Sequence, residues 1–110
     1  MQGGNEMEGI WYAHFTSGEV YGDGVAVLHD GLVQGADPAH TYSGSYQEEG
    51  SHLYVNVRVS PYAGSLLPAH LTHPITCFLR GSVTGDSAQI TGHPNNRPDA
   101  TISVELRKGE

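Results

Sequence analysis

Histidine is the residue type in this chain that most readily suggests metal chemistry, and there are seven of them. His70 and His73 are the closest pair, three positions apart in a proline-containing segment. A structural zinc site usually takes three or four ligands at short, regular spacings. The single cysteine, Cys77, lies in an apolar run and does not complete such a set. We therefore expect no metal site, and we interpret the two histidines as exposed loop residues.

Acidic and nucleophilic side chains are the next candidates for chemistry. Glu48 and Glu49 are adjacent near the tip of a predicted hairpin, so their side chains point to opposite sides, a poor geometry for two carboxylates that share a substrate. No serine stands in a Gly-x-Ser-x-Gly context, and the chain has no glycine-rich phosphate-binding loop. We expect no enzyme and no cofactor. Glu48 and Glu49 remain either solvated turn charges or a protein-binding site.

A set of aromatic and aliphatic residues is more informative. If these side chains point inward, they either fill a packed core or line an apolar pocket. Plain packing is the favoured alternative, but buried tyrosine hydroxyls need hydrogen-bond partners, which a ligand or ordered water could supply. The candidate cavity-lining residues are Trp11, Phe15, Tyr42, Tyr46, Leu53, Val55 and Val57.

These residues fall on segments that alternate with a period of two, which is typical of half-buried strands. The clearest stretch is residues 41–60, two alternating runs joined by an acidic, glycine-containing turn. Asp30-Gly31 is typical of a two-residue turn with positive φ at both positions, and Gly22-Asp23-Gly24 indicates a bulge or sharp bend. Residues 61–74 are a connector with one helical turn near 65–67. Strands are predicted at residues 9–16, 20–29, 32–35, 40–48, 51–60, 75–84, 87–93 and 100–107.

Eight short strands joined mostly by hairpin turns predict an all-β fold, an antiparallel meander. Closing the meander into a barrel removes two exposed edges, so we favour a barrel over a sandwich, although periodicity alone fits both. The 110 residues fit one domain at 9–110, preceded by a polar segment, residues 1–8, that is expected to be flexible and to contribute little to the fold.

Charge excludes some classes of partner. The chain has 5 basic and 12 acidic residues, a formal net charge of −7, and its basic residues are scattered. Direct nucleic-acid binding and attraction to anionic membranes are therefore not expected, whereas basic protein partners are favoured. The sequence shows no secretion signal and no apolar stretch long enough to span a membrane, so we expect a soluble cytoplasmic protein with a buried, inert Cys77.

Three segments in the observed order and spacing resemble a known family. They are Gly9-Ile10-Trp11 through Phe15, residues 25–37 (VAVLHDGLVQGAD), and residues 41–46 (TYSGSY) followed by residues 53–59 (LYVNVRV). From Glu8 to Arg107 the chain resembles the family of the type III secretion negative regulator GrlR.

The resemblance implies an eight-stranded, lipocalin-like (calycin-like) β-barrel that forms a homodimer. It also implies negative regulation of transcription, in which the barrel binds a protein partner, such as a transcriptional activator, and keeps it from DNA. The family's acidic hairpin tip corresponds here to Gln47-Glu48-Glu49-Gly50, which retains two acids. Two other functions remain open: a carrier that holds a small apolar ligand in the barrel, and a structural domain without a ligand.

Overall fold

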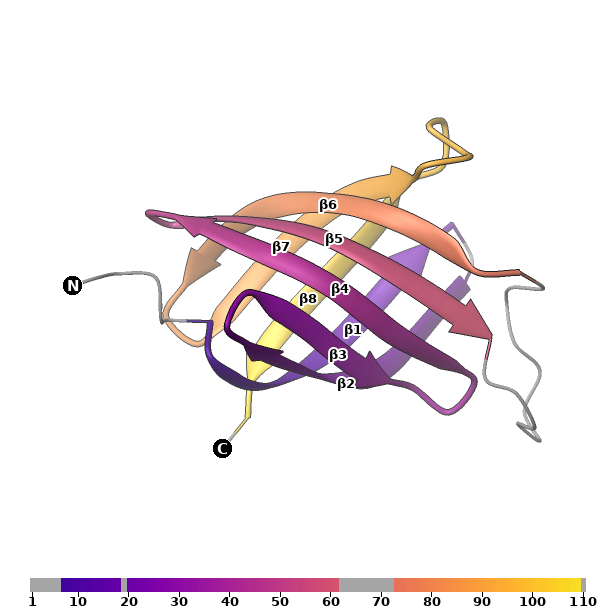
Figure 1. The fold of residues 1–110 in the computed structure, drawn as a ribbon. Coiled ribbons are helices and arrows are strands. Elements are labelled where there is room, and N and C mark those ends of the chain that lie inside the picture. Colours follow the sequence, from indigo (N-terminus) through magenta and orange to yellow (C-terminus); the bar gives the residue numbers. More distant parts are fainter. Residues whose placement is uncertain (1–6, 19, 62–72, 110) are drawn as a thin grey trace.

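The computed structural model describes residues 7–18, 20–61 and 73–109, and it is an all-β protein. Eight antiparallel strands follow one another around a closed barrel, as Figure 1 shows. The predicted eight-stranded meander is therefore confirmed, and the barrel replaces the sandwich alternative. The strands are β1 (Gly9–Ser17), β2 (Val20–His29), β3 (Leu32–Ala36), β4 (His40–Glu49), β5 (His52–Pro61), β6 (Ile75–Thr84), β7 (Ser87–Pro94) and β8 (Ile102–Lys108).

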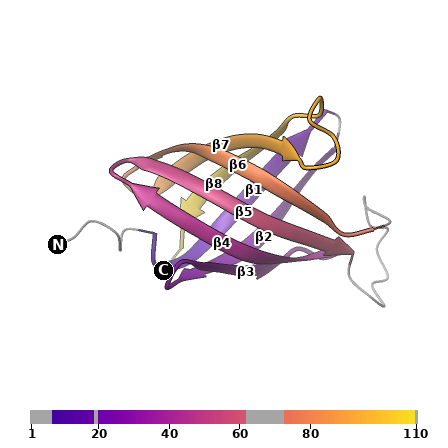
Figure 2. The same cartoon turned by 45° about the horizontal axis from the view of Figure 1, so that its top comes forward.

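Closure is made by β1 and β8, which pair antiparallel from Trp11 opposite Lys108 to Thr16 opposite Ser103. Every strand therefore has two paired neighbours, and the two edges of an open meander are absent (Figure 2). The start of β1, the β4–β5 turn and the end of β8 lie at one end of the barrel, which we call the Trp11 end. The ends of β1, β5 and β7 lie at the opposite end, which we call the Asp37 end.

The two-residue alternation of the sequence sorts side chains between the interior and the solvent. On β5, Leu53, Val55 and Val57 are buried, whereas Tyr54 and Asn56 between them are exposed. The same parity holds on the other strands because a barrel interior is reached only by every second residue. The buried core consists of Met7, Trp11, Ala26, Leu28, Val33, Tyr46, Leu53, Val55, Val57, Cys77, Leu79, Ala88, Ile90 and Leu106.

Two glycines leave room for neighbouring atoms. A β-carbon at Gly22 would lie 2.6 Å from Cζ of Phe15, whereas one at Gly35 would first meet the backbone of β2, 2.3 Å from the carbonyl oxygen of Val25. Of the predicted bulge or sharp bend at residues 22–24, the bulge is wrong, because β1 and β2 pair without interruption from Gly9 opposite Leu28 to Ser17 opposite Val20. Gly22 is explained by the space that the Phe15 ring occupies, and Gly35 by the close approach of the β2 backbone.

Asp30 and Gly31 have φ values of 53° and 79°, which confirms the predicted turn with positive φ at both positions. The predicted helical turn near 65–67 and His70 lie outside the described residues. Among the residues that the structure describes, no helix is long and apolar enough to cross a membrane.

The segment before β1 differs from the expectation for residues 1–8. Met7 is fully buried, and its amide donates a hydrogen bond to Oε1 of Glu48 at 3.2 Å. Glu8 accepts a hydrogen bond from the amide of Asp30 at 2.8 Å. The expectation of a segment that contributes little is therefore wrong for Met7 and Glu8, because sequence alternation does not reveal a residue that plugs the end of a barrel.

Candidate functional site

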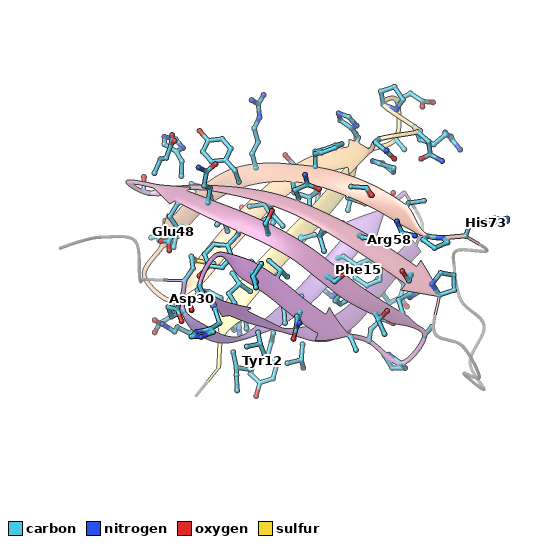
Figure 3. The ribbon with its side chains drawn as sticks, viewed as in Figure 1. Tyr12, Phe15, Asp30, Glu48, Arg58 and His73 are labelled. Carbon is cyan, nitrogen blue, oxygen red and sulfur yellow. The ribbon has the colours of Figure 1, made fainter. Side chains whose placement is uncertain are left out.

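A cavity of about 290 Å³ occupies the barrel interior. Its wall is mainly apolar and comes from strands all around the barrel, so its lining residues are far apart in the sequence. Four of the seven predicted lining residues do line it, namely Phe15, Tyr42, Val55 and Val57. In Figure 3, Phe15 lies within the ring of strands, whereas Tyr12 on the same strand points away from the barrel.

The other three predicted lining residues, Trp11, Tyr46 and Leu53, are packed in the core instead. The indole Nε1 of Trp11 donates a hydrogen bond to the carbonyl oxygen of Met7 at 3.0 Å, and the ammonium of Lys108 lies 5.7 Å from the indole ring centroid. Met7, Trp11 and Leu53 are the largest fully buried side chains. The Trp11 end is therefore a packed core that Trp11 and Tyr46 help to fill. At the opposite end, Phe15 and Tyr42 line the cavity instead.

Three polar side chains in the cavity wall, Asp37, His40 and Tyr42, form a hydrogen-bonded cluster at the Asp37 end. The side chains of His40 and Asp37 are only 4% and 5% exposed. Oδ1 of Asp37 accepts hydrogen bonds from the amides of Ala39 and His40, both at 2.7 Å, and lies 3.0 Å from Nδ1 of His40. Oδ2 accepts the hydroxyl hydrogen of Tyr42.

The cluster favours an ionised carboxylate. Burial raises the pKa of Asp37, but hydrogen bonds from Tyr42, the Ala39 amide and His40 outweigh it and hold that pKa below its usual value. Burial and the neighbouring carboxylate raise the pKa of Tyr42, so its hydroxyl keeps its hydrogen at neutral pH. The apolar cavity thus ends at an ionised carboxylate that is held by hydrogen-bond donors.

Asp37 and His40 were not predicted as site residues, because Asp37 lies between the predicted strands 32–35 and 40–48 and His40 is the first residue of the second. A signal was present in the sequence. An aspartate whose side chain accepts amide hydrogens two and three positions later is a common local turn, and here it precedes a strand. What the pattern could not show is that this turn is buried and faces Tyr42.

Cys77 also lines the cavity, and it is buried, as expected. Burial raises the pKa of its thiol to about 11. Thiolate is the reactive form of cysteine, so this side chain acts as a small apolar part of the wall.

Glu48 and Glu49 point in opposite directions, as predicted. Glu48 is paired with the fully buried Leu53, shares its inward face and is only half-buried, whereas Glu49 is exposed. Figure 3 shows Glu48 at the Trp11 end, where Oε1 accepts the Met7 amide hydrogen. Of the two acids, Glu49 alone is presented to solvent at the hairpin tip.

Two surface features lie outside the cavity. The apolar strip, our name for Ile10, Tyr12, Val25 and Val27, consists of exposed side chains on β1 and β2 that pair directly across the strands. A groove on the outer face of β4–β7 is lined largely by polar side chains together with Tyr54 and Phe78.

One group of potential metal ligands was not predicted. Glu8, His29 and Asp30 bring one ligand atom each within 4.8 Å of one another at the Trp11 end. Nδ1 of His29 lies 2.7 Å from Oε1 of Glu8, and this hydrogen bond raises the pKa of His29. Because His29 and Asp30 are exposed and already paired, the group is explained as a surface ion-pair network. His73, of the predicted loop pair, is exposed.

No protein-family model matches this chain, and no curated protein is significantly similar to it. The resemblance to the secretion-regulator family therefore stays a prediction. A closed barrel by itself does not specify a function, so the function is argued from the cavity and from the outer surface.

Proposed function

We propose that this protein binds a small, mainly apolar molecule inside its barrel. The cavity of about 290 Å³ carries this proposal, because packed interiors normally leave few voids larger than a water molecule. Eight-stranded barrels have an interior just wide enough for one small ligand. Burying an apolar ligand in a preformed, mainly apolar site is favourable, and transfer from water contributes roughly 25 cal/mol per Å² of apolar surface.

The filled Trp11 end supports the same function, because it leaves the empty volume bounded on one side. Trp11, Met7 and Leu53 are fully buried there, so a ligand would not need to displace them. The volume is near the lower limit of roughly 300–1,000 Å³ for ligand pockets, and it therefore suits a compact molecule.

A dye-binding experiment tests the proposal. The neutral dye N-phenyl-1-naphthylamine is expected to bind with one-to-one stoichiometry and to gain fluorescence. Val57→Trp places a larger side chain in the cavity, so we expect at least about a tenfold loss of dye affinity, since a filled cavity cannot accept the ring system. Asn56→Trp adds the same side chain to the exposed face one residue away and is the matched control.

Native mass spectrometry of freshly purified protein is the second measurement, and bound small-molecule mass is expected. Equal dye affinity for Val57→Trp and Asn56→Trp, with both variants folded by circular dichroism, would show that the dye binds outside the barrel and would contradict the proposal.

The apolar strip favours a second candidate function, protein binding. Tyr12 is 56% exposed, and Ile10, Val25 and Val27 are each more than 40% exposed, so the four side chains offer a continuous apolar surface. Contiguous exposed apolar patches often mark interaction sites. Tyr12 pairs with Arg107 on β8. Glu105 lies two residues before Arg107 and is exposed on the same outer face of β8, so the border of the apolar strip carries both signs of charge.

We propose that the occupant of the strip is a second copy of this chain. A two-fold symmetric interface uses the same patch on both subunits, and a border with both charges can complement itself. Such a homodimer is the form in which a barrel of the regulator type would bind an activator, with Glu49 left at the exposed hairpin tip for a basic partner. This cytoplasmic, regulatory function rests on the resemblance.

Sedimentation equilibrium tests the dimer. The wild-type protein is expected to dimerise, and Tyr12→Glu with Val25→Glu is expected to give monomers, because four like charges would meet at a two-fold interface. Tyr54→Glu with Phe78→Glu changes two exposed aromatic residues on β5 and β6 and is the control. A monomeric wild-type protein at high concentration would contradict the dimer and would leave the cavity proposal unaffected.

A further inference from the structure

We propose that the cavity selects uncharged apolar molecules that carry a hydrogen-bond donor, such as a phenol or alcohol, over carboxylates, and that the Tyr42 hydroxyl oxygen is the selecting acceptor. This inference rests on the proposed ligand-binding function and names its ligand class.

The Asp37 carboxylate already has its full set of donors. An ionised carboxylate accepts at about four lone-pair positions. Oδ1 of Asp37 is approached by the amides of Ala39 and His40 and by Nδ1 of His40, and Oδ2 by the hydroxyl of Tyr42. Nδ1 of His40 is also 3.2 Å from Oδ2. A ligand therefore has little to gain from Asp37 directly, and the role of this residue is to position its neighbours.

Tyr42 is the neighbour whose orientation matters. Its hydroxyl hydrogen points to Asp37, so the same oxygen can offer a ligand only an accepting lone pair. Tyr42 also lines the cavity. A β-carbon at Gly24 would lie 2.8 Å from the carbonyl oxygen of Ala36 and 3.0 Å from Oη of Tyr42, so a side chain at this position would crowd the hydroxyl. A ligand group that donates a hydrogen bond is thus complementary to Tyr42, and one that only accepts is not.

The charge of the Asp37 carboxylate also favours uncharged ligands over carboxylates. The Asp37 carboxylate is 5% exposed and lies in the cavity wall, so little water screens it from a ligand in the cavity. Charges of the same sign repel more strongly when they are removed from water. A ligand carboxylate at this end would lose its hydration and face a second anion. The Asp37 end therefore disfavours anionic head groups, such as those of fatty acids.

Three ligands with one ring system test the inference by isothermal titration calorimetry at pH 7. 2-Naphthol is a neutral donor, 2-methoxynaphthalene only accepts, and 2-naphthoate is an anion. We expect 2-naphthol to bind about fivefold to tenfold more tightly than 2-methoxynaphthalene, which is the range for one buried hydrogen bond, and 2-naphthoate to bind most weakly. Tyr42→Phe combined with Asp37→Asn is expected to remove the advantage of 2-naphthol and to leave the affinity for 2-methoxynaphthalene within about twofold, because Tyr42→Phe alone would open Oδ2 of Asp37 to the hydroxyl of the ligand.

Tyr46→Phe is the matched control, because Tyr46 is a buried tyrosine on the same strand, packed in the core at the Trp11 end. It is expected to retain the preference for 2-naphthol. The affinities of the three ligands for the wild-type protein test the inference even where the variant at Tyr42 does not fold. Equal or tighter binding of 2-naphthoate, or equal binding of 2-methoxynaphthalene, would overturn the inference while the cavity function stands. Failure of all three ligands and of N-phenyl-1-naphthylamine to bind would overturn both.

Discussion

Phe15 and Gly22 are paired across β1 and β2, and the phenyl ring of Phe15 lies where a side chain at position 22 would have to be. A β-carbon at Gly22 would be 2.6 Å from Cζ and 2.9 Å from Cε2 of this ring. Phe15 also lines the cavity. The absence of a side chain on one strand thus fixes where an aromatic ring on its neighbour can lie, and with it one wall of the ligand site.

Gly22→Ala is therefore expected to destabilise the protein by about 1–3 kcal/mol, because an added methyl group in a packed interior forces a ring off its preferred position. Urea unfolding followed by circular dichroism measures the loss. Asp23→Ala changes the next, exposed residue and is expected to stay within about 0.5 kcal/mol of the wild type. Equal stability of the two variants would show that Phe15 moves without cost.

The relation between Phe15 and Gly22 also shows how far the sequence allowed prediction. Alternation placed Leu53, Val55 and Val57 on the inward face correctly, because a strand has only two faces and one of them must be apolar. It could not distinguish a bulge at Gly22 from room for a ring, because that depends on which residue lies opposite on the next strand. The register of strand pairing decides which residues lie opposite one another on neighbouring strands. The sequence of a single strand does not reveal that register.

The candidate site was predictable only in part, for the same reason. Phe15 and Tyr42 were candidates for the cavity wall because they are large aromatic residues that could point inward, although plain packing was the favoured alternative. Trp11 has the same parity as Phe15 but is in the filled half, because Met7 folds over it, and nothing in the polar N-terminal sequence indicates this contact. Asp37 was missed because its burial depends on packing of the barrel end against Tyr42.

Met7→Ala tests whether the buried side chain of Met7 stabilises the Trp11 end of the barrel. Met7 is fully buried, so its truncation is expected to cost about 2–5 kcal/mol and to expose the indole of Trp11 to water. Because Trp11 is the only tryptophan, its fluorescence emission reports this directly and should shift to longer wavelength.

Leu32→Ala is the control for this truncation, because Leu32 is a large apolar residue that is 57% exposed on β3. It is expected to cost less than about 0.5 kcal/mol and to leave the fluorescence unchanged. A Met7→Ala variant with the stability and emission of the wild type would show that the segment before β1 does not support the barrel.

The reactivity of Cys77 tests whether the cavity wall is closed to solvent. With a pKa of about 11, the thiol is ionised at pH 8 only about one time in a thousand, against about one in four for a free cysteine of pKa about 8.5. Reaction with Ellman's reagent is therefore expected to be at least about 100-fold slower in the native protein than in concentrated urea. Saturation with N-phenyl-1-naphthylamine should slow it further. Complete native reaction at the unfolded rate would contradict a buried thiol.

Asp37→Asn tests the ionised carboxylate at the Asp37 end. The folded pKa of Asp37 is lower than its ordinary value, so the stabilisation from its ionised form is fully present above about pH 4 and is lost as the pH falls through the folded pKa. An asparagine there accepts with one oxygen only and turns a donating NH₂ toward other donors. We therefore expect a loss of about 1–3 kcal/mol at pH 7.

The shape of the pH dependence distinguishes this effect from a simple packing defect. The difference in unfolding free energy between the wild type and Asp37→Asn should shrink below pH 4, because protonation removes the charge from the wild type alone. Asp86→Asn, at an exposed turn position, should follow the wild type throughout. A difference that persists undiminished down to pH 2 would mean that the donors around Asp37 do not favour its ionised form, and the acceptor-only state of the Tyr42 hydroxyl would then lose its basis.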